Sequence, residues 1–313
     1  MEENKTLNFN KIQNLKHGEN VHQNASLYSY DEELDWVLLN GSEITYSNFI
    51  NASLALKVSA EFFDVSAITI VKNNTICSVA LAENNSLAFD KALDSDPIAP
   101  FGATIAFTKE INGILARKLS EIPTEMIIAP SFEENALEIL KKRKNLKLIK
   151  INTPIQQVAK FNQEEVVLTP FGALIQEKDN KDLDVKTFKV ATKKKPQQSE
   201  LEDMIFAFKV AKHLKTSGIV IAKDLRTLGI SSCQANTTDS LQVAINKVCD
   251  SLKDAIVACD CAINSINDIQ IMAQERITGL IQPMGSLADN EIIQNADKLE
   301  ISIVSTGLEH IKY

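Results

Sequence analysis

The sequence predicts an α/β protein, and two observations lead to this prediction. Short apolar runs of strand length alternate with longer helix-like stretches along the chain. The 313 residues, 44% of them hydrophobic, are enough to bury the cores of two ordinary domains. Neither half shows a fixed-period repeat or a low-complexity tract, which argues against a solenoid. The alternation therefore indicates a layered α/β architecture.

Several apolar runs are expected to form buried strands, because each is of strand length and alternates with helix-like stretches. They lie at residues 67–71, 126–129, 218–222, 255–258, 279–281 and 301–304. Their spacing leaves room for a helix between most successive strands, as layered α/β folds require.

Two stretches have the spacing of amphipathic helices, residues 133–144 and 200–215. In the second, apolar residues recur at intervals of three and four, which places them on one helix face. Ser199 precedes an acidic first turn that begins with Glu200. Serine caps exposed amide groups and acidic side chains favour the positive helix end, so we predict that the helix is capped by Ser199.

The pattern loosens between about residues 150 and 200, where Thr153-Pro154 and Thr169-Pro170 interrupt it and residues 177–186 form a charged, solvated run. We therefore predict a first subdomain over residues 1–160, a bridging segment over 161–195 and a second subdomain over 196–313.

Composition excludes several classes of protein. The net charge of -8 disfavours a nucleic-acid surface, and the run Lys193-Lys194-Lys195 is too short to change this. The N-terminal residues lack the features of a signal peptide, and no apolar run approaches the ~20 residues of a membrane span. Five cysteines show no disulfide framework. A cytoplasmic protein without nucleic-acid or membrane partners is expected.

A metal site finds little support in the sequence. His17-Gly18-Glu19 has the H-x-E form of the zinc deaminases, but the P-C-x-x-C partner motif is absent. Cys259-Asp260-Cys261 alone cannot close a tetrahedral zinc site. Walker, G-x-G-x-x-G and G-x-S-x-G motifs are absent too. We therefore expect no metal and no common phosphate loop or serine nucleophile.

Longer motifs, in order along the chain, resemble one family. Residues 15–23 read L-K-H-G-E-N-V-H-Q and resemble the L-R-Y-G-E-N-P-H-Q of the AICAR transformylase part of the bifunctional AICAR transformylase/IMP cyclohydrolase family. Residues 39–48 resemble its L-x-G-x-x-L-S-Y-N-N, and residues 96–102 its D-P-x-S-A-F-G-G. Further similar segments lie at 125–130, 192–196, 209–213, 222–230, 281–286 and 306–310. The resemblance covers about residues 13–313; the cyclohydrolase domain would precede Leu15 and is expected to be absent.

The resemblance implies a fold of two cytidine-deaminase-like three-layer α/β/α subdomains without zinc, in a homodimer with sites between protomers. It implies a stand-alone formyltransferase of de novo purine biosynthesis. The family's co-substrate, 10-formyltetrahydrofolate, gives its formyl group to the 5-amino group of AICAR. An AICAR-like nucleotide and a folate are therefore the expected small-molecule partners.

The family's catalytic pair corresponds to Lys72 and Asn73. Its V-K-H-x-N-P-C-G reads V-K-N-N-T-I-C-S here, beginning at Val71. In the family, the histidine takes the proton of the amine while the lysine assists with charge. Because the amide of Asn73 is not basic, the roughly 10²- to 10⁴-fold contribution of a general base is expected to be lost.

Other motif positions are the predicted substrate-binding residues. They are Lys16, His17, Gly18, Asn48, Phe101, Gly102, Glu125, Ser217, Gln234, Thr237, Asp260 and Glu309. Several depart from the family. Ser217 replaces an asparagine, and Thr237 and Glu309 stand where arginines would serve the phosphate, so Glu309 would repel it. Ala262 and Ile263 replace an aromatic pair.

Several motif residues also have a simpler structural interpretation. Lys72 could be a surface lysine that ends a strand. Gly18, Asn48, Gly102 and Gln234 could serve turn and loop geometry alone. The side chains of His22 and His213 are more readily explained as hydrogen-bonding groups at caps or core edges, and Asp260 could cap a loop or touch a ligand.

Two function hypotheses follow. The chain could be an AICAR formyltransferase, or a relative with an altered substrate, that uses Lys72 and a replacement base. Alternatively, it could be a catalytically silent paralogue, a pseudoenzyme that keeps the fold to sense a ligand or to partner an active subunit. The family motifs favour the first hypothesis, whereas the changed site residues favour the second.

Overall fold

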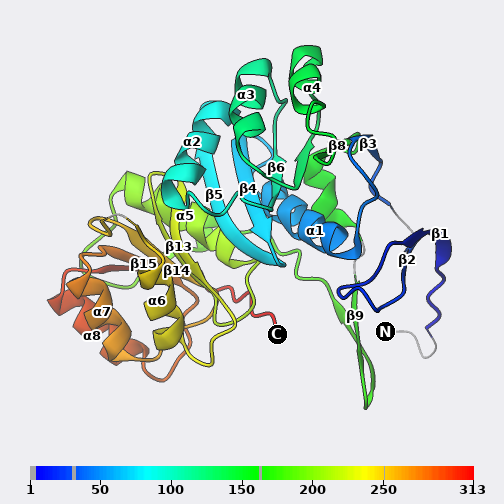
Figure 1. Ribbon diagram of the computed structural model, residues 1–313. Coiled ribbons are helices and arrows are strands. Elements are labelled where there is room, and N and C mark those ends of the chain that lie inside the picture. The colour runs from blue at the N-terminus through cyan, green and yellow to red at the C-terminus, as the bar shows by residue number, and fades with distance from the viewer. Residues whose placement is uncertain (1–4, 30–32, 162–163, 250) are drawn as a thin grey trace.

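The computed structural model describes residues 5–29, 33–161, 164–249 and 251–313. Two sets of elements in it follow the same chain order (Figure 1). The first set is α1 (Tyr46–Ala60), β4 (Ser66–Lys72), β5 (Thr75–Ala82), α2 (Asn85–Ser95), β6 (Thr104–Phe107), α3 (Gly113–Glu121), β7 (Met126–Ala129), α4 (Glu134–Leu140) and β8 (Lys147–Ile151). The second set is α5 (Gln198–Ala211), β12 (Ile219–Lys223), β13 (Arg226–Ser231), α6 (Thr237–Asn246), β14 (Ile256–Cys259), α7 (Ile266–Gln274), β15 (Gly279–Gln282), α8 (Asp289–Lys298) and β16 (Ser302–Ser305). We call these sets the first and second repeat.

The remaining elements flank or join the two repeats. They are β1 (Asn10–Leu15), β2 (Ala25–Ser29), β3 (Trp36–Asn40), the 3₁₀ helix η1 (Ile155–Lys160), β9 (Glu164–Thr169), β10 (Gly172–Glu177), the 3₁₀ helix η2 (Val185–Thr187) and β11 (Lys189–Val190). β1 with β2, and β9 with β10, form separate antiparallel hairpins, and the second projects from the body in Figure 1. Among the described residues, no helix combines the length and apolarity needed to cross a membrane.

One twelve-stranded mixed sheet runs through both repeats, in the order β11-β16-β15-β14-β12-β13-β5-β4-β6-β7-β8-β3. Within each repeat, the first two strands form an antiparallel hairpin. The third strand pairs antiparallel with the first strand of that hairpin, and the later strands add to the sheet in parallel. The repeats meet where β13 lies beside β5, with the single registered pair Arg226 and Ala80. A second link at this seam is the bond from Leu81 N to Leu225 O at 2.9 Å.

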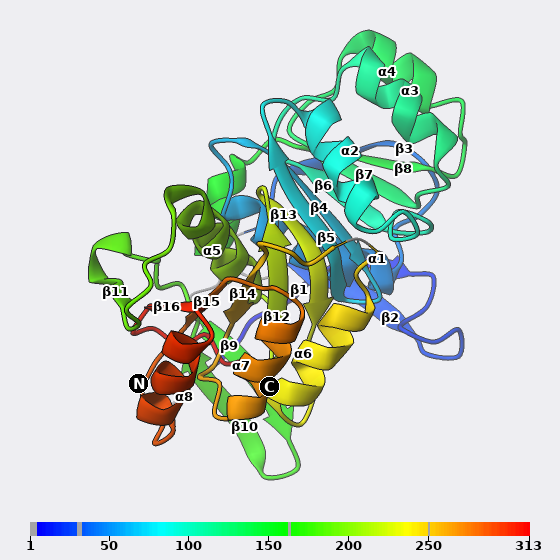
Figure 2. The same ribbon diagram turned by 90° about the vertical axis from the view of Figure 1, so that its left-hand side faces the viewer.

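Helices cover both faces of the sheet, as the apolar runs required (Figure 2). One face carries α1 and α5, which pack on buried strand residues such as Val71 and Val220. The other face carries α2, α3 and α4 in the first repeat and α6, α7 and α8 in the second, over residues such as Ile70 and Ile221. Each strand is therefore shielded on both sides, which explains its continuous rather than alternating apolar sequence.

The structure confirms the α/β class and the predicted strands, each within one or two residues of its expected bounds. Two helix predictions need correction. α4 ends at Leu140 instead of residue 144, because the chain turns at the basic run that follows. α5 begins at Gln198 and ends at Ala211, and Ser199 is not its cap. The cap is Gln197, whose backbone N–H donates to Oε2 of Glu200 at 2.7 Å.

Candidate functional site

Lys72 ends β4 and pairs with Thr75 across a two-residue hairpin turn. Both central residues of the turn, Asn73 and Asn74, have positive φ, at 53° and 55°. Two left-handed residues are the requirement of the tightest hairpin turns, and asparagine tolerates this conformation well. The turn is held from the helix side, because Oδ1 of the buried Asn51 in α1 accepts from Asn74 N at 2.7 Å. Local geometry therefore explains the asparagine at position 73.

Lys72 reaches a second predicted site segment. Its Nζ donates to the backbone carbonyl of Phe101 at 2.8 Å. Gly102, with φ of 69°, follows and donates its N–H to Pro123 O at 2.8 Å. The structure thus brings together two segments that are 29 residues apart in the sequence. Phe101 is 47% exposed as a residue, so it is accessible to a ligand.

Asn48 and Glu125 form a third part of this region. Asn48 Nδ2 donates to Glu125 Oε1 at 2.8 Å, and Lys147 Nζ reaches the same oxygen at 3.2 Å. Asn48 also supports α1, because its Oδ1 accepts from Thr45 N in a capping box. Glu125 and Gly102 both line a cavity of about 480 Å³. Asn48 therefore has both the structural role and the neighbours expected of a site residue.

Ser217 and Asp260 lie together in the second repeat. Oδ1 of the fully buried Asp260 accepts from Gly218 N at 2.8 Å, while the carbonyl of Ser217 accepts from Ser240 Oγ at 2.6 Å. The other carboxylate oxygen, Oδ2, is buried without a hydrogen-bond partner among the described residues. Burial raises the pKa of Asp260 above its usual value, against the hydrogen bond from Gly218, which lowers it.

The other predicted residues of the second repeat are dispersed. Thr237 begins α6 and its hydroxyl donates to Asp268 Oδ2 at 2.7 Å, which is a structural role. Gln234 Nε2 bonds locally to Ser232 O at 3.2 Å. Glu309 is exposed in the C-terminal tail. The structure does not join these three residues to the Lys72 turn through hydrogen bonds or ion pairs among the described residues.

Lys16, His17 and Gly18 lie in the loop between β1 and β2, and their contacts are local. His17 Nδ1 is 2.8 Å from Gly18 O, and Gly18 N donates to Gln23 O at 2.8 Å. The separate hairpin carries these residues at the right of Figure 1. Their sequence resembles a site motif, but in this chain they belong to a different sheet from Lys72.

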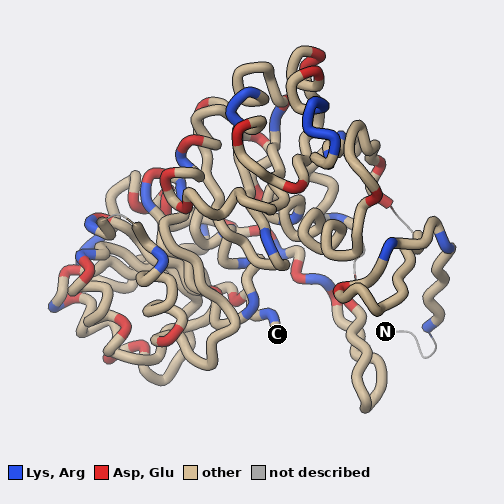
Figure 3. The backbone as a smooth tube through the Cα atoms, viewed as in Figure 1, with Lys and Arg blue, Asp and Glu red and all other residues tan. Residues whose placement is uncertain are grey.

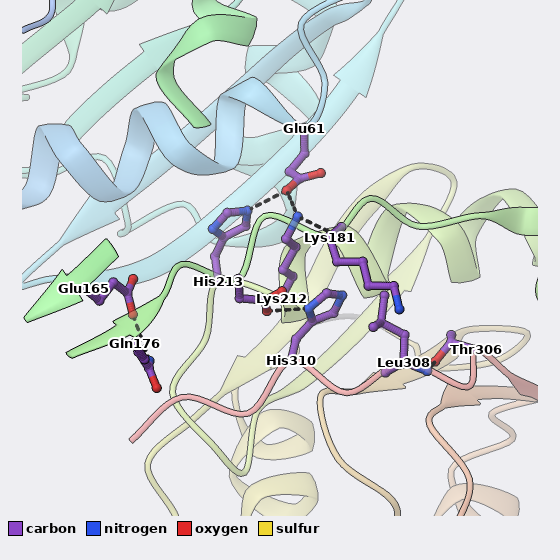
Figure 4. Close-up of polar contacts among 10 residues, drawn as sticks. Glu61, Glu165, Gln176, Lys181, Lys212, His213, Thr306, Leu308 and His310 are labelled. Carbon is purple, nitrogen blue, oxygen red and sulfur yellow. Dashed lines mark hydrogen bonds and ion pairs between the residues drawn. The ribbon is translucent and has the colours of Figure 1, made fainter. Parts of the chain in front are cut away.

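The prediction made no use of Glu61, which joins the two repeats (Figure 4). Its Oε1 accepts from Lys212 Nζ at 2.9 Å and lies 3.0 Å from His213 Nε2. Glu61 is the C-cap residue of α1, and Lys212 is the C-cap residue of α5. The only sequence signal was the similarity of residues 209–213 to the family, and it gave no partner for them.

Burial and neighbouring charges set the protonation states of Glu61 and His213. Burial would raise the pKa of Glu61, but the hydrogen bonds and charges of His213 and Lys212 outweigh it and hold the pKa at about 2. Burial lowers the pKa of His213 to about 4, against the bond to Glu61. At neutral pH an ionised Glu61 therefore accepts from a charged lysine and a neutral histidine. His213 is a core-edge hydrogen-bonding group, as its simpler interpretation predicted.

A second buried histidine contact lies nearby. His310 Nδ1 is 2.6 Å from Asp179 Oδ2, and the His310 ring is 5.5 Å from that of Phe208. The contact ties the C-terminal tail to the segment after β10 (Figure 4). Asp179 and His310 thus anchor the bridging segment against the second repeat.

Cys259, Asp260 and Cys261 offer three possible metal ligands within 4.8 Å of one another. The two sulfur atoms are 3.7 Å apart. The contact with Cys261 is the main cause that raises the pKa of the Cys259 thiol, and burial raises it further. Three donors from consecutive residues leave a tetrahedral site one ligand short. The expectation that no metal binds stays a prediction.

Comparisons with known proteins point in one direction. The family model described as the AICARFT/IMPCHase bienzyme matches residues 1–247. The bifunctional purine biosynthesis protein PurH of Anoxybacillus flavithermus is 36% identical over 313 residues, which are 98% of this chain and 60% of that protein. PurH of Aquifex aeolicus is 36% identical over 314 residues, with the same two shares. The chain thus spans about 60% of the length of these relatives.

A solved structure, RibD of Acinetobacter baumannii, aligns with 85% of this chain and 74% of its own. The sequence identity is 10% and the TM-score is 0.25, so this likeness supports no statement about the fold.

Proposed function

Because the chain belongs to the AICARFT/IMPCHase bienzyme family, we propose that it is a formyltransferase of purine biosynthesis. It transfers the formyl group of 10-formyltetrahydrofolate to the 5-amino group of AICAR. The observation that carries the proposal is the bond from Lys72 Nζ to Phe101 O, which unites two family motifs at the end of β4. The two repeats correspond, in this proposal, to two cytidine-deaminase-like subdomains at 1–160 and 196–313, bridged by 161–195.

Lys72 is the proposed electrostatic group of the reaction. When the amine attacks the formyl carbon, negative charge develops on the formyl oxygen, and a nearby ammonium group stabilises it. The amine nitrogen must then lose a proton, and the bond from the formyl carbon to N10 breaks as N10 takes up a proton and tetrahydrofolate leaves. Asn73 cannot accept the amine proton, so this step needs a base other than residue 73. Phe101, Gly102 and Glu125 are the substrate-binding residues closest to this centre in the proposal.

Three observations favour a second candidate function. Asn73 satisfies the turn and supplies no base, while Thr237 is engaged by Asp268 and Glu309 adds negative charge to the tail. A catalytically silent paralogue that keeps the ligand site would have these residues. In this alternative, the chain senses an AICAR-like nucleotide or partners an active homologue in the dimer of the family.

Calorimetric titration with AICAR and with a folate analogue, followed by a formyl-transfer assay, separates the candidates. Turnover by the wild-type protein would contradict the silent paralogue. Absence of AICAR binding would contradict the enzyme. We expect Asn73→His to raise the transfer rate by about 10²- to 10⁴-fold, because histidine restores a base and tolerates positive φ. Asn74→His, one residue along the same turn, is the matched control and should leave the rate unchanged.

A further inference from the structure

A charged cavity of about 580 Å³ lies where the end of α1, η1, the base of the β9–β10 hairpin and the C-terminal tail converge. Five lysines and four carboxylates line it together with His213. The lysines come from five separate parts of the chain: Lys57, Lys160, Lys178, Lys212 and Lys312. Figure 3 shows basic segments at the C-terminus and near the start of the projecting hairpin.

Three of the four carboxylates already have partners, and Glu165 Oε2 accepts from Gln176 Nε2 at 3.2 Å. Glu61 is paired with Lys212, and Asp179 with His310. The half-buried Lys57 and Lys312 have no ion pair with a carboxylate of the described residues, and Lys178 Nζ donates to a neutral acceptor, Phe161 O, at 2.6 Å. The cavity therefore holds more positive charge than its own wall neutralises.

The ammonium groups in this wall disfavour one another. Burial lowers the pKa of Lys178, and the charges of Lys57 and Lys312 lower it further, against Glu165. Burial also lowers the pKa of Lys312, with Asp179 opposing and Lys57 contributing. A bound anion would relieve this repulsion, since opposite charges within a few ångströms favour the charged form of an amine.

An apolar cavity of about 500 Å³ adjoins the charged one, because Lys57 and Lys178 line both. Its wall is rich in aromatic side chains, including Tyr28, Trp36, Phe49 and Phe161. The rings of Trp36 and Phe49 meet edge-on, with centroids 5.9 Å apart and planes at 74°. Such walls suit a flat ring, and a few charged groups at one end then fix its orientation.

We propose that the two cavities together form a site for a small ligand with a flat aromatic body and an anionic end, either carboxylate or phosphate. The anionic end lies among Lys57, Lys178 and Lys312, and the ring lies against Trp36 and Phe49. The site is separate from the Lys72 turn. None of the four residues of that turn, Lys72 to Thr75, lines either cavity.

The chain contains a single tryptophan, so Trp36 fluorescence reports directly on the apolar cavity. Two probes distinguish the anionic ends: 4-aminobenzoylglutamate carries carboxylates, and adenosine 5′-monophosphate carries a phosphate. We expect saturable quenching by at least one probe, weakened by salt because exposed charges are screened. The absence of saturation with both probes at millimolar concentration would overturn the proposal.

Lys57→Gln tests the charged end, and Lys298→Gln in the last turn of α8 is the matched control. Losing one charge-assisted hydrogen bond should weaken probe binding about tenfold in Lys57→Gln and leave Lys298→Gln unchanged. Lys72→Gln should also bind normally. Equal affinities of Lys57→Gln and wild type, or lost binding in Lys72→Gln, would overturn the separate site. Circular dichroism of each variant confirms folding, and Lys57→Arg should restore affinity.

Discussion

The hairpin turns that follow the first helix of each repeat have the same position in the topology but are held by different hydrogen bonds. The β4–β5 turn reads Lys72-Asn73-Asn74-Thr75, and the β12–β13 turn reads Lys223-Asp224-Leu225-Arg226. Both central pairs have positive φ, at 53° and 55° and at 54° and 56°. Each turn is held by a buried residue of the covering helix, Asn51 in α1 or Asp203 in α5.

The difference lies in the number of bonds and in the use of the side chains. Asn51 makes one bond to the first turn, whereas the carboxylate of Asp203 accepts from Asp224 N at 3.0 Å and Leu225 N at 2.7 Å. Leu225 also packs against the core at the seam, while Asn73 is exposed. The comparison teaches that the second turn holds the repeats together and the first leaves its side chains available for a ligand.

The largest effect is expected from Asp203→Ala. Two amide groups lose a charged acceptor, so the free energy of unfolding should fall by about 2–4 kcal/mol. Asp203→Asn keeps one acceptor oxygen and should lose less, because burial raises the pKa of Asp203 and so penalises its charge. Urea unfolding measures both variants. A loss below about 1 kcal/mol for Asp203→Ala would contradict the support role.

The free energy of unfolding should depend on pH because of the contact between Glu61 and His213 at the ends of α1 and α5. The pKa of His213 is about 4 in the folded protein, below its ordinary value of 6.5. The unfolded chain therefore takes up the proton first, and stability is full above pH 6.5 and falls by about 3 kcal/mol as the pH drops from 6.5 through 4. Glu61, with a pKa lowered to about 2, extends the loss below pH 4.5.

His213→Gln removes the titrating group but keeps an amide donor for Glu61. Its unfolding free energy should therefore change less between pH 6.5 and 4 than that of the wild type. His22→Gln, in the exposed loop of the first hairpin, is the control. If the unfolding free energies of all three proteins change equally with pH, the contact between Glu61 and His213 does not cause the acid sensitivity.

Asn51→Ala is the matched test for the first turn. It removes one neutral hydrogen bond to Asn74 N, so a loss of about 1 kcal/mol is expected in urea unfolding. A loss as large as that of Asp203→Ala would break the comparison, since it would give both turns the same support.

The smallest effect is expected at the exposed end of the first turn. Asn73→Gly should change the free energy of unfolding by less than about 0.5 kcal/mol, because glycine adopts positive φ freely. Asn73→Ala should cost about 1 kcal/mol at the same position, since its Cβ disfavours that conformation. Thermal unfolding compares the two variants. Equal stabilities would mean that the turn does not impose its backbone on residue 73.

Local sequence signals predicted the strands well. The strand at 126–129 is buried on both faces of the sheet, so its sequence is continuously apolar. Such a run can be recognised without knowing which strands pair with it. Helix ends were predicted less well. The start of α5 depends on the bond between Gln197 and Glu200, and glutamine is not a favoured cap, so Ser199 misled the prediction.

Long-range pairings were beyond the sequence alone. Motif order placed Lys72 and Phe101 in one site, and their hydrogen bond agrees with it. No local pattern pairs Glu61 with His213, which is 152 residues away, or predicts that β13 lies beside β5. Such contacts depend on how the two repeats pack, and only the folded chain defines that arrangement.

The seam between β5 and β13 has a consequence for the order of folding. Within each repeat, strand partners are close in the chain, so their pairing closes only short loops. The seam joins Ala80 to Arg226 and Leu81 to Leu225, so its contacts form only when a very long loop closes. Each repeat should therefore acquire its structure early and dock last, and a double-jump refolding experiment would reveal docking as the slow phase.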